Sequence, residues 1–412
     1  MRALVGQAHM PMLQRIYVHY ADGTASRAAG GAPPLVLDIT PGRFPSLQDI
    51  SLTGAAAALT PSLACPLRCL EMGNPKGPQV GLPLAPFLDC LASFSRLETL
   101  KVRRCFAVPT APLGGPGARP TLLPRLKDIR IQDHPSNVNQ IISRLAVPSS
   151  AKVNLSGELQ GASLQQYCSA FMAMLPRDLG ACLPALRSIA KIEVLCDRTE
   201  CAILGTTHDQ PDNHRQITLE LFTDLLRDFN HEDDDAGQAA RGALFHTMIQ
   251  TIAYIFPGIP AASRLKVFGP VNYIPLETWG SVLVRFRSLR RLMVDDATLR
   301  RFPYELLNAL LSPLPPANQT VICPRLEELE IFGDCGEDED GEEGDPLRAL
   351  FECLERRKTH GGGGLLSKLN VELFSDTILE EERLERYRVR FAPLALECKV
   401  ANQVQNGLRI RD

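Results

Sequence analysis

A short phrase of apolar and polar positions recurs along this chain: an apolar residue, two mostly polar residues, an apolar residue, one mostly polar residue and a final apolar residue. Its last three positions alternate, which is the period of a strand with one buried face. The clear copies occupy residues 13–18, 47–52, 67–72, 97–102, 126–131, 189–194, 289–294, 326–331 and 366–371, and weaker copies end at Leu155, Leu219 and Val267. The phrase predicts strands over 15–18, 49–53, 69–73, 99–103, 128–132, 191–195, 291–295, 328–332 and 368–372.

Segments of helical length separate the phrases. Several phrases have a proline two residues before their first apolar residue, which ends a preceding helix and lets a strand begin. These prolines are Pro11, Pro45, Pro124 and Pro324, and the clearest helical segments are 86–94, 221–229, 304–311 and 347–358. A strand followed by a helix, many times over, predicts an α/β protein with a parallel sheet whose helices all cover one face.

The phrase resembles the repeat of the leucine-rich-repeat family, which continues with two further residues and then Asn or Cys. Leu97, Leu100, Val102 and Cys105 fit that longer pattern, whereas His134 stands at the Asn or Cys position of another copy. The resemblance covers nearly the whole chain. It implies an irregular leucine-rich-repeat solenoid, with a curved parallel sheet on the concave face and helices on the convex face.

Two further segments, 286–292 and 323–329, are similar to the repeat regions of fungal F-box proteins. This likeness implies the substrate-recognition part of an F-box-like ubiquitin ligase. In such proteins an F-box helical module precedes the repeats and binds a Skp-type adaptor. Here the chain opens inside a repeat at Leu13, so we expect no such module, and the adaptor stays an open question.

The spacing of the phrases is irregular, which predicts insertions. We expect one solenoid over residues 1–412, with insertion loops at 109–120, 199–214, 231–235 and 333–345. The first is rich in Gly and Pro, the second is polar, and the last two are acidic. Loops of this kind are often functional or disordered.

Composition narrows the class of protein and its compartment. A net charge of −3 argues against a protein that mainly wraps nucleic acid or lies on an anionic membrane. The twelve cysteines are mostly scattered singly, which indicates reduced thiols. The most apolar stretch, 243–256, is too short for a membrane span, and residues 1–13 lack the apolar core of a signal peptide. We expect a cytoplasmic or nuclear protein that binds neither nucleic acid nor membrane.

The sequence contains no motif that indicates catalysis. Gly361 to Gly364 are followed by Leu365 instead of the Lys of a phosphate-binding loop. Cys182, Cys196 and Cys201 precede His208 and His214, but structural zinc usually takes closely spaced ligand pairs. We expect a protein that is not an enzyme and needs neither metal nor cofactor. An enzyme with a site assembled from distant repeats, and a non-catalytic structural paralogue, remain the alternatives.

The polar position between the last two apolar positions of each phrase points away from the core, so stacked strands align these residues on one face. On that face Lys101, Arg103 and Arg130 have no acid between them. Phe268, Met293 and Phe332 place large apolar side chains at positions that are expected to face water. An exposed apolar patch usually marks an interface. We predict a protein partner, with an oligomeric state left open. The predicted contact residues are Tyr17, Lys101, Arg103, Arg130, Lys266, Phe268, Met293 and Phe332. The alternative is that insertion loops cover this face.

Overall fold

A computed structural model describes residues 9–19, 35–57, 59–73, 81–108, 120–159, 161–197, 201–207, 215–223, 235–256, 262–296, 302–311, 322–334, 345–359, 364–375 and 381–404. The chain divides into two compact units. Unit 1 comprises Met1–Leu186 and Arg215–Asp224, and unit 2 comprises Arg187–His214 and Leu225–Asp412. Both are mixed α/β, with helices and mostly parallel strands, which confirms the predicted class.

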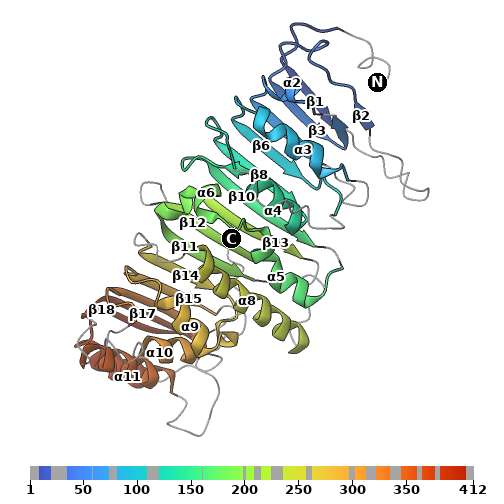
Figure 1. Cartoon of the computed structure of the whole chain (residues 1–412). Coiled ribbons are helices and arrows are strands. Elements are labelled where there is room, and N and C mark those ends of the chain that lie inside the picture. The colour runs from blue at the N-terminus through green and yellow to red at the C-terminus, as the bar shows by residue number, and fades with distance from the viewer. Residues whose placement is uncertain are drawn as a thin grey trace. The chain divides into compact units, whose positions relative to one another are not determined.

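Among the described residues of unit 1, seven parallel strands lie side by side in the order β1, β3, β5, β6, β8, β10, β13 (Figure 1). Their bounds are β1 (Arg15–His19), β3 (Asp49–Thr53), β5 (Cys69–Gly73), β6 (Thr99–Arg103), β8 (Asp128–Asp133), β10 (Lys152–Leu159) and β13 (Ile217–Thr223). Two short parallel pairs join β2 (Leu35–Leu37) to β4 (Ala55–Ala57) and β7 (Thr121–Leu122) to β9 (Leu145–Ala146). The helical segments are α2 (Pro61–Ala64), α3 (Leu84–Cys90), η3 (Leu91–Ser93), α4 (Pro135–Ser143), α5 (Leu164–Met174), α6 (Leu179–Cys182) and η4 (Pro184–Ser188).

In the described part of unit 2, seven strands lie side by side in the order β12, β11, β14, β15, β16, β17, β18. The pair β11–β12 is antiparallel and the others are parallel. The strands are β11 (Ile189–Cys196), β12 (Cys201–Thr207), β14 (Arg264–Phe268), β15 (Arg291–Asp295), β16 (Glu328–Asp334), β17 (Leu366–Ser375) and β18 (Ala395–Val404). The helices are α8 (Asp235–Ile255), η5 (Val271–Tyr273), α9 (Leu276–Leu283), α10 (Tyr304–Leu311), α11 (Pro346–Thr359) and α12 (Glu381–Phe391).

The longer helices lie against one face of the strands within each unit. Figure 1 shows α3, α4 and α5 on the same side of the unit 1 strands, and α8, α9 and α10 on the same side of the unit 2 strands. Sequence sets where some of these helices begin. Ser163 and Gln166 form a capping box at α5, in which the Ser163 hydroxyl accepts from the backbone N–H of Gln166 and the Gln166 side chain accepts from that of Ser163.

All nine strands predicted from the clear phrases are confirmed, and the three weaker copies lie in β10, β13 and β14. The fifth positions of successive phrases face one another in register: Tyr17, Ser51, Glu71, Lys101, Arg130, Asn154 and Thr218 in unit 1, and Glu193, Lys266, Met293, Glu330 and Asn370 in unit 2. Side chains that are spread over the sequence therefore form continuous rows on each group of strands.

Hydrogen bonds connect equivalent positions of successive phrases just before each strand begins. In unit 1 the backbone N–H of the residue at the second position of a phrase donates to the carbonyl of the residue at the second position of the preceding phrase. These bonds run from Gln48 to Gln14, Arg68 to Gln48, Glu98 to Arg68 and Lys127 to Glu98, at 2.7–2.8 Å. In unit 2 Arg290 donates to Ser263, Glu327 to Arg290 and Ser367 to Glu327, at 2.7–2.8 Å. Successive phrases therefore share a backbone hydrogen bond at the same position, in addition to their pattern of apolar and polar residues.

The apolar positions of the phrases form the core. Each predicted core residue is at most 2% exposed, namely Leu100, Val102, Ile129, Ile131, Leu292, Val294, Leu329 and Ile331. The helices supply the opposing layer with large buried side chains such as Phe171, Phe245 and Trp279. The strand register predicted from the phrase is therefore confirmed, because a shift of one residue would have exposed this whole set.

Some connecting segments differ from the prediction. The helix predicted over 221–229 is wrong at its start, because residues 221–223 continue β13, and residues 224–229 lie outside the described part of the chain. The segment 199–214 was predicted as a loop, yet its residues 201–207 form β12. The other predicted loops lie mostly outside the described part of the chain, which omits residues 109–119, 231–234 and 335–344. The single-solenoid organisation remains a prediction.

Candidate interaction surface

We define the outer face of each unit as the strand side chains on the side opposite the helices. It comprises the fifth position of each phrase and the residues two positions before and after it. Because successive side chains of a strand point to opposite faces, these residues stand apart from the core. The predicted contact residues fall on this face in both units, Tyr17, Lys101, Arg103 and Arg130 in unit 1 and Lys266, Phe268, Met293 and Phe332 in unit 2.

The predicted basic trio of unit 1 comes together on two neighbouring strands. Lys101 of β6 is the register partner of Arg130 of β8, and Arg103 lies two residues beyond Lys101. Acids next to the trio pair with two of its members. The Lys101 ammonium lies 2.5 Å from a carboxylate oxygen of Glu71, and Arg130 lies 3.2 Å from Asp128.

Arg103 differs from the other two cations. It is exposed, and among the residues that the structure describes its guanidinium is bonded to no carboxylate. Surface ion pairs such as those of Lys101 and Arg130 contribute little to stability, but they reduce the field of the paired cation. Arg103 is therefore the member of the trio best placed to meet an external anion.

Tyr17 is exposed but lies apart from this trio. Its side chain is 68% exposed on β1, and strands β3 and β5 lie between β1 and β6. The structure therefore brings three of the four predicted residues of unit 1 together and leaves the fourth at the edge of the strands.

Polar side chains outside the predicted set lie on the outer face of unit 1 or, in the case of Arg104, directly after one of its strands. Arg104, in the left-handed backbone region with φ of 52°, donates to Glu158 at 2.5 Å. The Ser156 hydroxyl donates to Glu220 at 3.0 Å. Cys69 of β5 has a pKa raised by burial and by the nearby Glu71 carboxylate, so it remains a thiol near neutral pH. Nothing in the sequence marked Arg104, because its role depends on a backbone conformation that is uncommon outside glycine.

In unit 2 a cation lies over an aromatic ring. The Lys266 ammonium is 4.3 Å from the centre of the Phe268 ring, within the range of a cation–π interaction. Met293 of β15 is the register partner of Lys266, and both Phe268 and Met293 are half-buried. Lys266, Phe268 and Met293, which the sequence predicted, therefore form one mixed cationic and apolar group.

Phe332 does not extend this group as an exposed anchor. It is only 7% exposed, and Asp295 lies between it and Phe268 in the strand register. The expectation that Phe332 adds exposed apolar surface is therefore wrong. Strand alternation fixes the side of the strands on which a residue lies, but neighbouring side chains decide how much of it water reaches.

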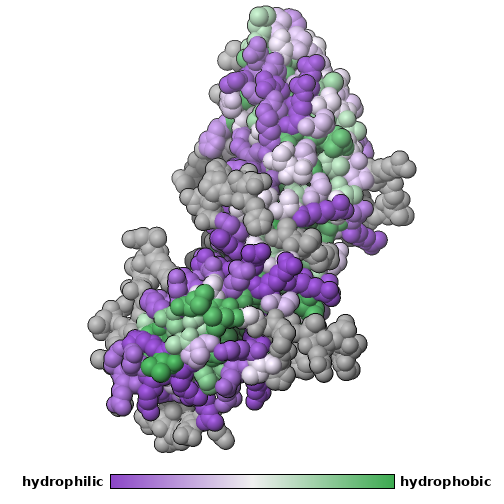
Figure 2. Space-filling view, turned by 90° about the vertical axis from the view of Figure 1, so that its left-hand side faces the viewer, coloured by the Kyte–Doolittle hydropathy of each residue, from purple (hydrophilic) through white to green (hydrophobic). Residues whose placement is uncertain are grey.

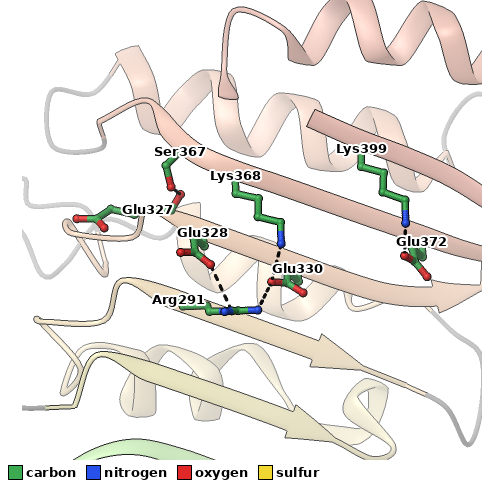
Figure 3. A network of polar contacts seen from close by, with 8 residues as sticks. All are labelled: Arg291, Glu327, Glu328, Glu330, Ser367, Lys368, Glu372 and Lys399. Carbon is green, nitrogen blue, oxygen red and sulfur yellow. Dashed lines mark hydrogen bonds and ion pairs between the residues drawn. The ribbon is translucent and has the colours of Figure 1, made fainter. Parts of the chain in front are cut away.

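A row of ion pairs crosses β15, β16 and β17 beside this group. Figure 3 shows Arg291 reaching Glu328 at 3.3 Å and Glu330 at 2.6 Å, and Lys368 reaching Glu330 at 3.5 Å. On the next strands Lys399 lies 2.7 Å from Glu372. These side chains rise from the side of the strands away from the helices, and Glu330 is buried beneath its two cations.

Arg264 extends the positive charge of unit 2. It is the register partner of Arg291, it precedes Lys266 on the same strand, and its side chain is exposed. Arg264 makes no ion pair with any residue that the structure describes, whereas Arg291 is shared between two glutamates. We call Arg264, Lys266, Phe268 and Met293 the basic-apolar patch.

The surface also carries apolar side chains outside the predicted set. Figure 2 shows a mostly hydrophilic surface from one side, with apolar residues gathered in one area of unit 2. Leu396 of β18 and Val389 of α12 are 75% and 66% exposed. Leu396 occupies the second position of a final phrase, where other copies carry polar residues such as Glu98 and Glu327.

The described part of the chain holds no group of three or more His, Cys, Asp or Glu side chains placed to bind a metal ion. Within the same residues no helix is both long and apolar enough to cross a bilayer. In comparisons with known proteins, no protein-family model matches the sequence, and no curated protein is similar enough to count as a relative.

Proposed function

We propose that this protein is an irregular leucine-rich-repeat solenoid that binds another protein through the outer face of its strands. The observation that supports it best is the hydrogen-bonded row of second positions, because the same residue of each phrase meets its equivalent in the next. Repeat proteins of this kind use the surface that their stacked strands present. The phrase residues inside are aliphatic and the outer residues are varied, as expected when the inside serves folding and the outside serves recognition.

The basic-apolar patch is the proposed contact in unit 2. Arg264 and Lys266 supply positive charge, and Phe268 with Met293 supplies apolar area beside it. Binding hot spots commonly combine an aromatic anchor with surrounding polar groups, while complementary charge sets the rate and orientation of the encounter. A partner segment with a carboxylate next to an apolar side chain fits this arrangement.

Capture by the full chain tests this proposal when paired variants are compared. Arg264→Glu with Lys266→Glu reverses two charges of the patch. Arg285→Glu with Arg287→Glu reverses two exposed charges in the turn after α9, away from the outer face. We expect proteins captured by the unmodified chain to be lost with the first pair and retained with the second.

Equal capture by both pairs would contradict the proposed contact, and so would equal loss. Circular dichroism melting of each variant shows whether the fold is kept. A photo-crosslinker at Met293 gives a direct reading, since the attached partner peptide is then sequenced.

The finer proposal is that the chain is the substrate-recognition part of an F-box-like ubiquitin ligase. It rests on the resemblance of segments 286–292 and 323–329 to fungal F-box repeat regions. It predicts that a Skp-type adaptor co-purifies with the full chain. Partners that bind the outer face without any adaptor would contradict the ligase role and leave the binding role intact.

A further inference from the structure

Two cysteines face each other across the β11–β12 hairpin. Cys196 ends β11, Cys201 begins β12, and the two are register partners in the antiparallel pair. Their sulfur atoms are 3.3 Å apart, and the residues are 1% and 0% exposed. The hairpin thus places two thiols in contact, although they are separated by four residues in the sequence.

The backbone geometry suits a covalent bond between them. Directly opposed residues of an antiparallel pair have Cα atoms about 4.5–5.5 Å apart. A disulfide accepts Cα separations of about 4.4–6.8 Å and needs a sulfur–sulfur distance of about 2.0 Å. Rotation of the two side chains, with a small movement of the strands toward each other, would shorten the sulfur–sulfur distance from 3.3 Å to that of a bond.

The thiols lie on the inner face of the hairpin, beneath α8. A Cβ atom at Gly269 would fall 2.8 Å from the Phe245 ring and 3.0 Å from the carbonyl oxygen of Cys196. The Cys196 and Cys201 side chains themselves are 1% and 0% exposed, so the folded layer leaves little room for a bulky adduct on either thiol. A disulfide between the two cysteines adds no atoms, so it fits the packed layer where a mixed disulfide does not.

We propose that Cys196 and Cys201 are a modification site, at which a low-molecular-weight disulfide such as oxidised glutathione closes an intrachain disulfide. When the hairpin opens, the thiolate of one cysteine attacks a glutathione sulfur and releases one glutathione thiolate. The second cysteine, as a thiolate, attacks the protein sulfur of the mixed disulfide and releases the other. Two protein thiols are oxidised, two glutathione molecules are formed, and the two protons end on them.

Other buried thiols of unit 2 lack this arrangement. Cys323 and Cys353 donate to the backbone carbonyls of Leu283 and Leu307. Burial raises the pKa of each to about 12, so both remain protonated and poor nucleophiles near neutral pH. They serve as internal controls for selective oxidation.

The sequence makes the product easy to identify. Trypsin cleaves after Lys191, Arg198 and Arg215, which places Cys196 in peptide 192–198 and Cys201 in peptide 199–215. The folded full chain is equilibrated in glutathione redox buffers, remaining thiols are alkylated, and the digest is analysed without reduction. We expect the two peptides to appear as one linked species, lighter by two hydrogen atoms than their sum, while Cys353 is alkylated in full.

Three variants sharpen the test. Cys196→Ala should abolish the linked species, and Cys353→Ala should leave it unchanged. Cys201→Ala with Ala202→Cys moves the thiol by one residue, to the opposite face of β12, so linkage should fall sharply if the hairpin register brings the sulfurs together. Separate alkylated peptides in the oxidised unmodified chain would overturn the proposal. Equal linkage in the shifted variant would overturn its structural basis.

Discussion

Asp133 shows how one buried carboxylate joins two elements of unit 1. Its Oδ2 accepts from the backbone N–H groups of Cys105 at 2.9 Å and Phe106 at 3.2 Å, just after β6. Its Oδ1 accepts from the N–H of His134 at 2.8 Å and from the side chain of Asn137 at 2.7 Å, at the start of α4. Burial raises the pKa of Asp133 in spite of these bonds. Asp296, seven residues after the first leucine of its own phrase, is likewise buried.

We predict that Asp133→Ala lowers the free energy of unfolding by about 2–4 kcal/mol, because the N–H groups of Cys105 and Phe106 lose their acceptor. Asp128→Ala, on the outer side of the same strand, removes a surface ion pair and should cost less than about 1 kcal/mol. Urea denaturation of both variants measures the difference. Similar losses would show that the Asp133 bonds contribute little.

His134 makes the start of α4 sensitive to pH. Its Nδ1 accepts from the N–H of Ser136 at 3.3 Å, which requires an unprotonated nitrogen. Burial lowers the pKa of His134 below its ordinary value of 6.5. Because the folded state disfavours the proton, the contribution of His134 to stability is complete above pH 6.5 and is lost as the pH falls below it.

We therefore predict that His134→Asn reduces the loss of stability between about pH 7.5 and pH 5.5, since asparagine caps a helix without titrating in this range. Denaturant titrations of the variant and the unmodified chain at both pH values measure this change. An equal loss in the two proteins would assign the pH dependence to other groups.

At the scale of the element, strands were predictable wherever the phrase kept aliphatic residues at its apolar positions. β18 was not predicted because two of the three apolar positions of its phrase hold Ala395 and Cys398 instead of large aliphatic residues. The structure places Ala395, Cys398 and Val400 in register with Leu366, Leu369 and Val371. β12 was not predicted because it is buried along nearly its whole length, so its sequence does not alternate between apolar and polar residues. A periodicity of two appears in sequence only when one face of a strand meets water.

The helix predicted over 221–229 is wrong at residues 221–223 for a different reason. Leu221, Leu225 and Leu226 fit a helical spacing, but β13 pairs with β10 over seven residues, from Ile217 to Thr223. Local propensity favoured a helix, and pairing along a neighbouring strand overrode it. The pairing partners of β13 in β10 lie more than sixty residues earlier in the chain, so the local sequence around β13 cannot reveal them.

We predict that Leu329→Ala, in the middle of β16, lowers the free energy of unfolding by about 2–5 kcal/mol, because it leaves a cavity at a fully buried position. Glu327→Ala, two residues earlier and exposed, removes only a 3.5 Å surface pair with Arg290 and should cost less than about 1 kcal/mol. Denaturant titration compares the two. A small effect at Leu329 would contradict the core assigned to this phrase.

At the scale of the whole molecule, sequence located the outer face but only part of its chemistry. The alternation within each phrase assigned all eight predicted contact residues to that face. It could not foresee that Glu71 pairs with Lys101, or that Phe332 is buried, because both depend on neighbouring strands. Of the eight residues, Tyr17, Arg103 and Arg130 are exposed, and Lys101, Lys266, Phe268 and Met293 are half-buried.

Charge reversal on the outer face of unit 1 separates the contribution of this face from that of the net charge of the chain. Changing Lys101, Arg103 and Arg130 to Glu subtracts two charges at each position, so the formal net charge falls from −3 to −9. If an acidic partner approaches this face, association should slow and its dependence on salt should weaken, because exposed charges act mainly through screened long-range attraction. Stopped-flow or surface-binding kinetics at several salt concentrations measure both effects with the captured partner.

Changing Arg96, Arg125 and Arg177 to Glu gives the matched control. All three are exposed residues of unit 1 outside its strands, and their reversal produces the same net charge of −9 by the same subtraction of six. A partner steered to the outer face should distinguish the two triple variants, with the slower association in the strand set. If both variants slow association equally, the partner responds to the total charge of the chain, and the outer face of unit 1 is not where it docks.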